Sequence, residues 1–532
     1  MAAPPPRCNI SLNATVNDIV SCVENGSLIG IEADSASPTD VYIFEFNPNT
    51  YFRNDKVERG FMKVFVSNPQ FPSLNGHFAD ETEALNYEIN VYQKTKELVN
   101  NNVIGHFVTY FTNMITSTKF NNLKNFIRDK ANMSDSQATT NLKRNTIYML
   151  YNQNSTRPAI NDNTLAATNP VNMSISKIND VRYKFILTEA VMPYSISSAT
   201  IQDRIQRLKN MPFNHSLKLS SINLSLENFT DCSAANLSDC NYLRDTLLEI
   251  YFQLAVTTYA MSLNHFVHND LHDGNVWIKR TAPKNIKYTL KQVNGSPSYT
   301  LTNCINFSML YDYDRAYNNK KAANRFLNGL EVYNQSNDII EQRDFIKILC
   351  YFMKSLLPSL TKIPSTRSSK VSNKDNIKSQ IYDSLLDCIC KKTDTTRGFV
   401  NVPRSDMGNL WRANRVRWPN DDDRYKDFWD SIFNNIVVSP RGITMNNYSC
   451  FLNEAPGQII KEQYGFLRPE IYTETLYPMP VIIDNLANLI NTYTPGKIRK
   501  NERADGDYNY NVRDLSQPQQ ESLLTRLLSI FY

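Results

Sequence analysis

An aspartate and an asparagine five residues apart lie in the part of the chain best equipped for chemistry. The octet 268–275 reads His-Asn-Asp-Leu-His-Asp-Gly-Asn, with Asp270 two residues after the first histidine and Asn275 at its end. A carboxylate can accept the proton of a hydroxyl group, and an amide oxygen is a hard ligand that suits Mg²⁺. Transfer of a phosphoryl group uses both, because its catalysis consists mainly of orienting a hydroxyl and neutralising phosphate charge. The octet therefore predicts phosphoryl transfer.

A second metal ligand is expected from a carboxylate at the end of a following strand. The segment 309–316 reads Met-Leu-Tyr-Asp-Tyr-Asp-Arg-Ala and places Asp312 directly after an apolar run. We expect Asp312 to join Asn275 as a ligand of Mg²⁺, with Tyr313 packed beneath it.

The elements expected before the octet form a small β-rich region. Alternating and β-branched residues predict strands, and apolar residues at helical spacing predict a helix. The strands are expected within 27–66 and at 105–113 and 183–189, and the helix over 80–99. Two polar stretches, 131–178 and 209–240, predict insertions or surface loops.

The octet itself is expected between a long helix and a hairpin. Apolar residues recur on one face of a helix over 242–264, which runs directly into the octet. A short strand at 276–278 follows, and then a hairpin about Asn294-Gly295, since Asn-Gly between alternating apolar runs is a strong hairpin signal. The later expectations are helices at 344–357 and 377–390, a linker at 496–514 and a last helix.

Composition excludes several classes of protein. The net charge of +5 is small for 532 residues and does not favour a nucleic-acid-binding protein. Nine cysteines at irregular spacing do not suggest a secreted disulfide framework, so we expect a reducing compartment. Cys388 and Cys390 form a C-x-C pair without a second pair at zinc-site spacing, and we expect them to be reduced in a core. We expect no signal peptide, because the first residues contain no apolar run. We also expect no transmembrane segment, because no apolar run approaches the length that spans a bilayer.

The motifs resemble the protein kinase-like fold. They are most similar to the divergent serine/threonine kinases of large nucleocytoplasmic DNA viruses (pox-, asfar- and iridovirus-like). Those kinases share His-Asn-Asp-Leu-His-x-Gly-Asn, an Asp-aromatic-Asp-Arg-Ala motif (here 312–316) and a hairpin between the two. The resemblance covers about residues 25–360. It implies an α+β, two-lobed fold with a small β-rich N-lobe and a larger, mainly helical C-lobe. It also implies ATP- and Mg²⁺-dependent transfer of the γ-phosphoryl group to serine or threonine hydroxyls of proteins.

The resemblance assigns a role to each candidate residue. Asp270 is the catalytic base, and Asn275 and Asp312 hold Mg²⁺. Lys63, in an apolar strand, reaches the α- and β-phosphates of ATP, and Glu88 on the next helix pairs with it. The alternatives are an edge-strand lysine at 63, and the nearby residues Glu81 and Glu83 in the role of Glu88.

Further residues are expected around the nucleotide. No G-x-G-x-x-G occurs, and Gly30 with the backbone amides of 34–37 is expected to cap the phosphates. The backbone at Glu189 and Val191 is expected to meet the adenine base; a plain core strand is the alternative. Asp344 resembles an aspartate that holds the catalytic loop, with a helix N-cap or a solvated residue as the alternative. No Ala-Pro-Glu follows Asp314, which argues against a conventional phosphorylated activation loop.

The expected domains follow from this assignment. They are an N-terminal extension (1–24), an N-lobe (25–191) with an insertion near 131–178, a C-lobe (192–390) with the catalytic loop and the hairpin, and a helical extension (391–532). We expect viral or host proteins as substrates, association with other virion proteins, no specific nucleic acid, and a location in the host cytoplasm or the virion.

Two other functions stay open at this point. One is a small-molecule phosphotransferase of the aminoglycoside or choline kinase type, whose H-x-D-L-H-x-x-N pattern is similar. The other is a catalytically inactive, kinase-like structural or scaffold protein of the virion, which the glycine-poor loop favours.

Overall fold

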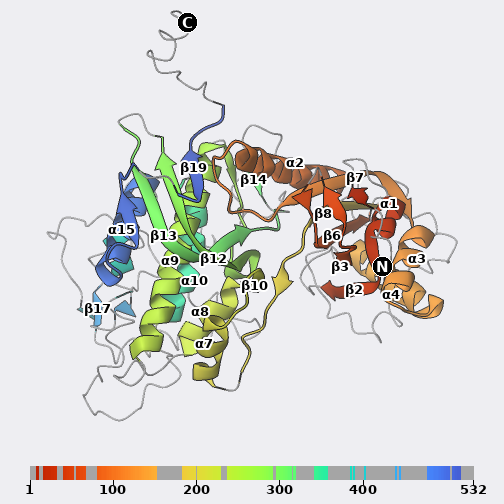
Figure 1. The fold of residues 1–532 in the computed structure, drawn as a ribbon, viewed down its shortest axis with the longest axis horizontal. Helices are drawn as coiled ribbons and strands as arrows, with labels where there is room; N and C mark the ends of the chain where they lie inside the picture. The colour runs from red at the N-terminus through yellow and green to blue at the C-terminus, as the bar shows by residue number, and fades with distance from the viewer. Residues whose placement is uncertain are drawn as a thin grey trace, which may run out of the picture. The chain divides into compact units, whose positions relative to one another are not determined.

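The chain has a mixed α+β structure that divides into two compact units (Figure 1). The computed structural model describes residues 7–10, 16–32, 40–52, 55–66, 81–151, 182–198, 200–228, 237–291, 295–313, 316–318, 341–356, 381, 384–385, 387–389, 401–402, 438–439, 442–444, 476–503 and 506–516. Unit 1 comprises 1–96, 108–192 and 324–328, and unit 2 comprises 97–107, 193–323 and 329–532.

Unit 1 is built on an antiparallel sheet, as the alternating sequence predicts. The strand order is β2-β3-β6-β8-β7, and each neighbouring pair is antiparallel. The strands are β2 (Val23–Glu32), β3 (Asp40–Phe46), β6 (Arg59–Val66), β7 (Tyr110–Lys119) and β8 (Arg182–Glu189). The expected helix is also present, as α2 (Glu81–Asn100).

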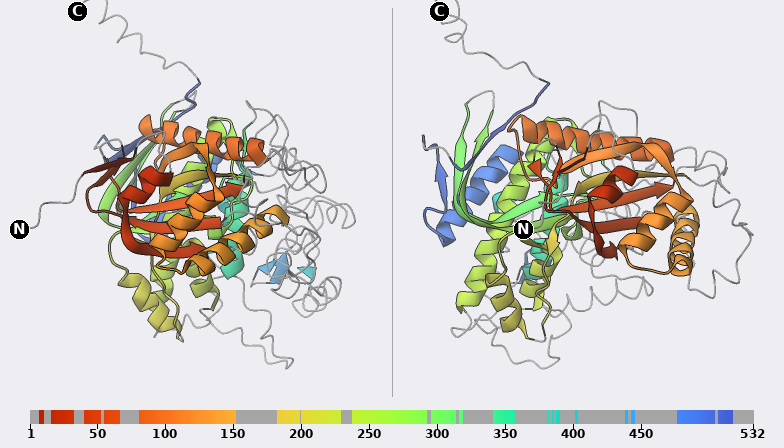
Figure 2. Two further views of the ribbon diagram at one scale, coloured as in Figure 1. Left: turned by 90° about the vertical axis from the view of Figure 1, so that its right-hand side faces the viewer. Right: turned by 45° about the vertical axis from the view of Figure 1, so that its right-hand side comes forward.

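The core of unit 1 lies on one face of this sheet. Successive side chains of a strand point to opposite faces, so every second residue of β3, β6 and β8 contributes to the core. Helices α3 (Phe120–Lys130) and α4 (Asp135–Tyr151) pack on that face (Figure 2). The residues buried between sheet and helices include Tyr42, Phe44, Met62, Val64, Leu123, Phe126, Ile127, Leu142, Tyr183, Phe185 and Leu187. Helix α4 corrects the expectation of a surface loop from residue 131, while 152–181 lie outside the described residues.

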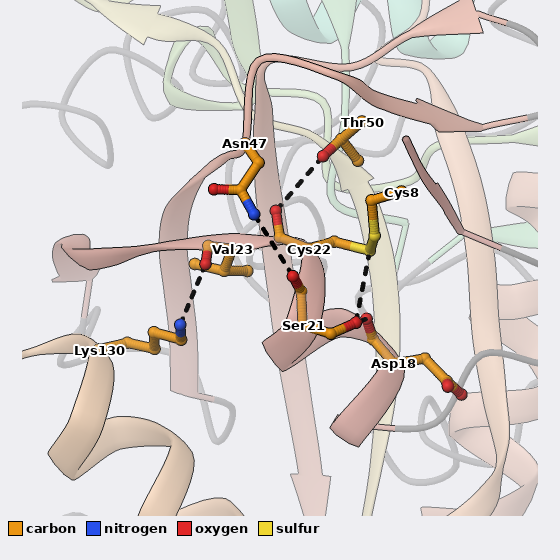
Figure 3. The surroundings of a disulfide bond; sticks show 8 residues. All are labelled: Cys8, Asp18, Ser21, Cys22, Val23, Asn47, Thr50 and Lys130. Atoms are coloured by element: carbon orange, nitrogen blue, oxygen red, sulfur yellow. Dashed lines mark hydrogen bonds between the residues drawn. A yellow bond between two sulfur atoms is a disulfide. The ribbon is translucent and has the colours of Figure 1, made fainter. Parts of the chain in front are cut away.

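The N-terminal segment belongs to unit 1 and is tied to it by a disulfide. Strand β1 (Cys8–Ile10) pairs in parallel with β4 (Thr50–Phe52), which pairs with β5 (Asp55–Lys56). Cys8 is bonded to Cys22 at the end of helix α1 (Val16–Cys22), with 5.6 Å between the Cα atoms (Figure 3). Cys240 is disulfide-bonded as well. These three cysteines differ from the reduced state expected in a reducing compartment, whereas Cys304 and Cys388 are free and buried, as expected for Cys388.

Unit 2 is organised around a long buried helix and a long hairpin. Helix α9 (Leu237–Leu263) spans 27 residues and is buried on almost every side. Strands β12 (Val276–Leu290) and β13 (Ser298–Leu310) form the expected antiparallel hairpin, longer than the sequence suggested. Its alternating apolar residues are buried, as predicted: Ile286, Tyr288, Leu290, Tyr299 and Leu301.

The polar stretch 209–240 is not a loop where the structure describes it. It contains β10 (His215–Lys218), which pairs with β12, and helix α8 (Leu219–Asn228). Helix α7 (Ile201–Lys209) precedes them. Buried residues of α8, such as Leu219 and Ile222, explain why a polar segment folds here.

The C-terminal part of the chain completes the unit 2 sheet instead of forming a linker. Strand β18 (Ile498–Lys500) pairs with β13, and β19 (Tyr508–Val512) pairs in parallel with β12. Helix α15 (Met479–Tyr493) packs on α9 (Figure 1). Helix α10 (Arg343–Leu356) forms as expected, and the last expected helix lies outside the described residues. Within the described part of the chain, no helix has the length and apolar character needed to cross a bilayer.

Candidate functional site

The loop 268–275 is held by helix α10. It follows α9 and β11 (Phe266–Val267), and it ends in a short 3-10 turn, Asp273–Asn275, that leads into β12. The backbone N–H groups of His268 and Asn269 donate to the two carboxylate oxygens of Asp344, at 2.5 and 3.0 Å. Asp344 is buried, so this contact replaces water for both partners. The alternative of a solvated Asp344 is therefore wrong.

Asp270 projects from this loop beside a lysine of the same helix. The Nζ atom of Lys347 donates to Oδ1 of Asp270 at 3.3 Å and to the backbone oxygen of Asn269 at 2.7 Å. The side chain of Asp270 keeps 19% of its surface exposed, while that of Lys347 keeps 9%. Burial lowers the pKa of the Lys347 ammonium; Asp270 and Asp344 act in the opposite direction.

Asn275 is locked to the same loop through its side-chain amide. Its Nδ2 donates to the backbone oxygen of Asp270 at 3.0 Å. Because the nitrogen of the amide is committed, the orientation of Oδ1 is fixed as well. Oδ1 accepts no hydrogen bond from the residues that the structure describes. The Asn275 amide therefore presents an oxygen in a fixed orientation.

Asp312 lies two residues after the end of β13 and directly follows Tyr311, which is bonded to Asn275. Val276 is opposite Leu310, and the N–H of Tyr311 donates to the oxygen of Asn275 at 3.4 Å. Asp312 has a φ of 67°, in the left-handed region, which aspartate tolerates better than most residues. The register thus brings the two predicted metal ligands to the same end of the hairpin.

Two tyrosines fix the segment that carries Asp312. The hydroxyl of Tyr311 donates to the oxygen of Gly274 at 2.8 Å, and the oxygen of Tyr311 accepts from Nε2 of His268 at 2.9 Å. Tyr313 is fully buried, with its ring centroid 5.1 Å from that of His268. Tyr313 therefore packs against the loop, while Asp314 and Arg315 lie outside the described residues.

His272 is folded back onto its own loop. Burial lowers the pKa of its imidazole; Asp270 and Asp312 oppose the shift, and Lys347 and His268 add to it. Its Nδ1 accepts the N–H of Gly274 at 3.1 Å, so the ring proton resides on Nε2. Burial thus favours the uncharged form of the His272 imidazole.

Lys63 and Glu88 meet inside unit 1. Nζ of Lys63 lies 3.0 and 3.2 Å from the two carboxylate oxygens of Glu88, and both residues are buried. Lys63 sits in β6, between β3 and β8, so the alternative of an edge-strand lysine is wrong. The pairing of Lys63 with Glu88 is the one expected from the sequence. The side chains of Glu81 and Glu83 lie outside the described part of the structure.

The residues expected at the adenine base differ in whether their backbone groups already make hydrogen bonds within the protein. The N–H of Glu189 donates to the oxygen of Thr109 at 2.8 Å, and that of Ala190 to the oxygen of Arg59 at 3.2 Å. The backbone of Val191 makes no hydrogen bond to described residues, so Val191 is better placed than Glu189 for a ligand. Gly30 lies in β2 opposite Ile43, just after a bulge, and 33–39 lie outside the described residues.

Sequence reasoning gave no role to Lys347 or Tyr311. Lys347 stands one helical turn after Asp344, on the same face, and that spacing was the available signal. Tyr311 precedes Asp312 and carried no signal of its own, because its contacts depend on the hairpin register.

Comparison with protein-family models and with curated proteins identifies no relative of this chain. The function has to be argued from the residues themselves.

Proposed function

We propose that this chain is an ATP- and Mg²⁺-dependent kinase that transfers the γ-phosphoryl group to serine or threonine hydroxyls of proteins, on a two-lobed kinase-like fold. The observation that carries the proposal is the loop 268–275. Asp344 holds its backbone, and the amide of Asn275 is bonded to the backbone of Asp270 at 3.0 Å. A partly exposed carboxylate and a fixed amide oxygen in one loop suit a reaction that depends on positioning.

The step assigned to Asp270 is proton acceptance. The oxygen of the acceptor hydroxyl forms a bond to the γ-phosphorus of ATP, and the bond from that phosphorus to the β–γ bridging oxygen breaks. ADP leaves with the electron pair of that bond, and the hydroxyl proton passes to the carboxylate of Asp270. The same proposal assigns Lys63, fixed by Glu88, to the α- and β-phosphates.

Asn275 and Asp312 fit a magnesium ion. No group of three or more His, Cys, Asp or Glu side chains suited to a metal occurs among the described residues. Mg²⁺ does not require one, because it usually takes one or two protein oxygens and completes its shell with phosphates and water. When bound, Mg²⁺ would neutralise phosphate charge. Asn275 Oδ1 and the Asp312 carboxylate are the oxygens that would hold it.

The test is phosphoryl transfer by the purified protein with Mg²⁺ and ATP labelled at the γ-phosphate. Casein and a basic protein serve as acceptors, with an aminoglycoside and choline beside them. We expect label on protein, and a loss of about 10²- to 10⁴-fold in kcat for Asp270→Asn, the range typical of a general base.

Asp273→Asn is the matched control, because Asp273 lies in the same loop and bonds Asn223 at 3.0 Å. We expect it to retain activity within about threefold, since the asparagine oxygen can still accept the bond from Asn223 and Asp273 has no role in the proposed step. Label on the small molecules alone would redirect the proposal to a small-molecule phosphotransferase. No transfer, together with no rise in melting temperature on adding ATP and Mg²⁺, would sink it.

A further inference from the structure

Lys347 approaches the loop from outside it. It lies on α10, one helical turn after Asp344, and both side chains reach the segment 268–270. Asp344 binds two backbone N–H groups, whereas Lys347 binds the next backbone oxygen, that of Asn269, and the carboxylate of Asp270. One turn of α10 thus fixes two backbone N–H groups, one backbone oxygen and the Asp270 side chain of the loop.

The contact is made by a buried cation. Lys347 keeps 7% of its surface exposed, and its Nζ lies 2.7 Å from Asn269 O and 3.3 Å from Asp270 Oδ1. Two bonds from one ammonium to a backbone atom and to a carboxylate restrict the side-chain rotamer of Asp270. With both bonds made in a buried position, Lys347 is committed to the loop.

The charged groups around Asp270 fit a lysine that holds its carboxylate in place. Asp344, Asp312 and Asp270 bring negative charge to this region, and burial lowers the pKa of the His272 imidazole. Arg343, next to Asp344, is the other cation facing Lys347. Lys347 is the cation in hydrogen-bond contact with the Asp270 carboxylate among the contacts described.

We propose that Lys347 is a positioning residue that acts through Asp270: it aims the carboxylate at the acceptor hydroxyl. This inference rests on the proposed function. Positioning has a large effect on rate, since a misplacement of about 1 Å can cost about 10²-fold. Nucleotide binding needs no contact with Lys347, so the effect falls on kcat and not on the KM for ATP.

The experiment compares kcat and KM for four variants of the full chain: Lys347→Met, Lys347→Arg, Asp270→Asn and the double variant Asp270→Asn/Lys347→Met. We expect Lys347→Met to lower kcat by about 10²-fold with the KM for ATP within about twofold, and Lys347→Arg to retain more activity because it keeps the cation. The double variant should be no slower than Asp270→Asn, because residues that act as a unit are not additive.

Lys497→Met is the matched control. Lys497 forms a comparably buried pair with Glu249 in the same unit, at 2.7 Å, and it does not contact the loop. It should lower stability and leave kcat within about threefold, as expected for a residue that acts on folding alone. If Lys347→Met fails to fold, Lys347→Gln replaces it, because an amide can still donate to Asn269 O without the charge.

The possible outcomes distinguish a failure of the proposed kinase function from a failure of the role proposed for Lys347. A wild type without transfer activity would overturn the proposed function. An active wild type in which Lys347→Met or Lys347→Gln keeps the full kcat would overturn the role of Lys347 alone. A double variant slower than Asp270→Asn would do the same, because Lys347 would then act independently of Asp270.

Discussion

The side-chain amide of Asn275 holds the loop with its nitrogen and presents its oxygen to the site. Its nitrogen closes the loop by donating to the backbone of Asp270, and this bond leaves its oxygen in a fixed position. An aspartate at 275 could offer an oxygen to a cation, but it could not donate to a carbonyl. The residue type therefore follows from the geometry of the loop as much as from the chemistry of a metal.

Candidate site residues can be predicted from sequence when they lie close together along the chain or on consecutive elements. Asp270 and Asn275 share one loop, and Lys63 and Glu88 stand on consecutive elements, so pattern and order were enough. Buried residues with distant partners cannot be found this way. His106 contacts Tyr288 and Ser308, 182 and 202 residues further along the chain, and no local pattern marks it.

His106 gives a prediction about pH. Its Nδ1 donates to the oxygen of Ser308 at 2.9 Å, and its Nε2 accepts from the hydroxyl of Tyr288 at 2.7 Å. Burial lowers the pKa of the His106 imidazole from 6.5 to about 4, although the bond to Ser308 opposes the shift. Between those values the unfolded chain binds a proton that the folded chain does not. The free energy of unfolding therefore falls as the pH falls from about 6.5 to about 4, by about 3 kcal/mol in all.

The measurement is urea unfolding followed by tryptophan fluorescence at several pH values. His106 and Trp277 belong to unit 2, and no tryptophan falls within the residues of unit 1. His106→Gln, which does not titrate, is the reference for the carboxylates that titrate in the same range. Parallel pH profiles for the two proteins would contradict the prediction.

At the scale of elements, the sequence predicts the β12–β13 hairpin of unit 2 but not the strands β18 and β19 that pair with it. The alternation of apolar residues over 286–301 predicted the β12–β13 pair. Strand β19 reads Tyr-Asn-Tyr-Asn-Val, and its strand character comes from pairing with β12, more than 200 residues earlier. A short polar strand of this kind is decided by its neighbour and not by its own composition.

The segment after β19 is fastened to the end of α9. Nδ2 of Asn264 donates to the oxygen of Arg513 at 2.8 Å, and its Oδ1 accepts the N–H of Leu515 at 3.1 Å. Asn264 is buried and stands four residues before His268. The C-terminal segment 506–516 thus supports the junction between α9 and the loop 268–275.

Removing this side chain should release the segment. We expect Asn264→Ala to cost about 1–3 kcal/mol, because it removes two part-buried hydrogen bonds to the C-terminal segment. Trypsin should then cut after Arg513 faster than in the wild type. Asn509→Ala is the control, since Asn509 bonds only Gly506 within its own turn among the contacts described. Equal cleavage rates for Asn264→Ala and the wild type would refute the support role.

At the scale of the whole molecule, the chain has two compact units, each with its own buried core. The place of residues 97–107 in unit 2 could not be predicted from sequence, because unit 1 flanks them on both sides. Units with separate cores can unfold separately, so a single melting temperature need not describe this protein. Unit 1 contains no tryptophan, so tryptophan fluorescence does not report on it, while circular dichroism reports on both units.

The disulfide of unit 1 allows the two transitions to be told apart. Cys8 and Cys22 are 14 residues apart, and closing a loop of this length stabilises a fold by about 3 kcal/mol through the entropy of the unfolded chain. The double variant Cys8→Ala/Cys22→Ala should therefore lower the melting temperature of unit 1. Circular dichroism should show the shift, and tryptophan fluorescence should not, because no tryptophan lies in unit 1. An equal shift in both signals would mean that the two units unfold as one.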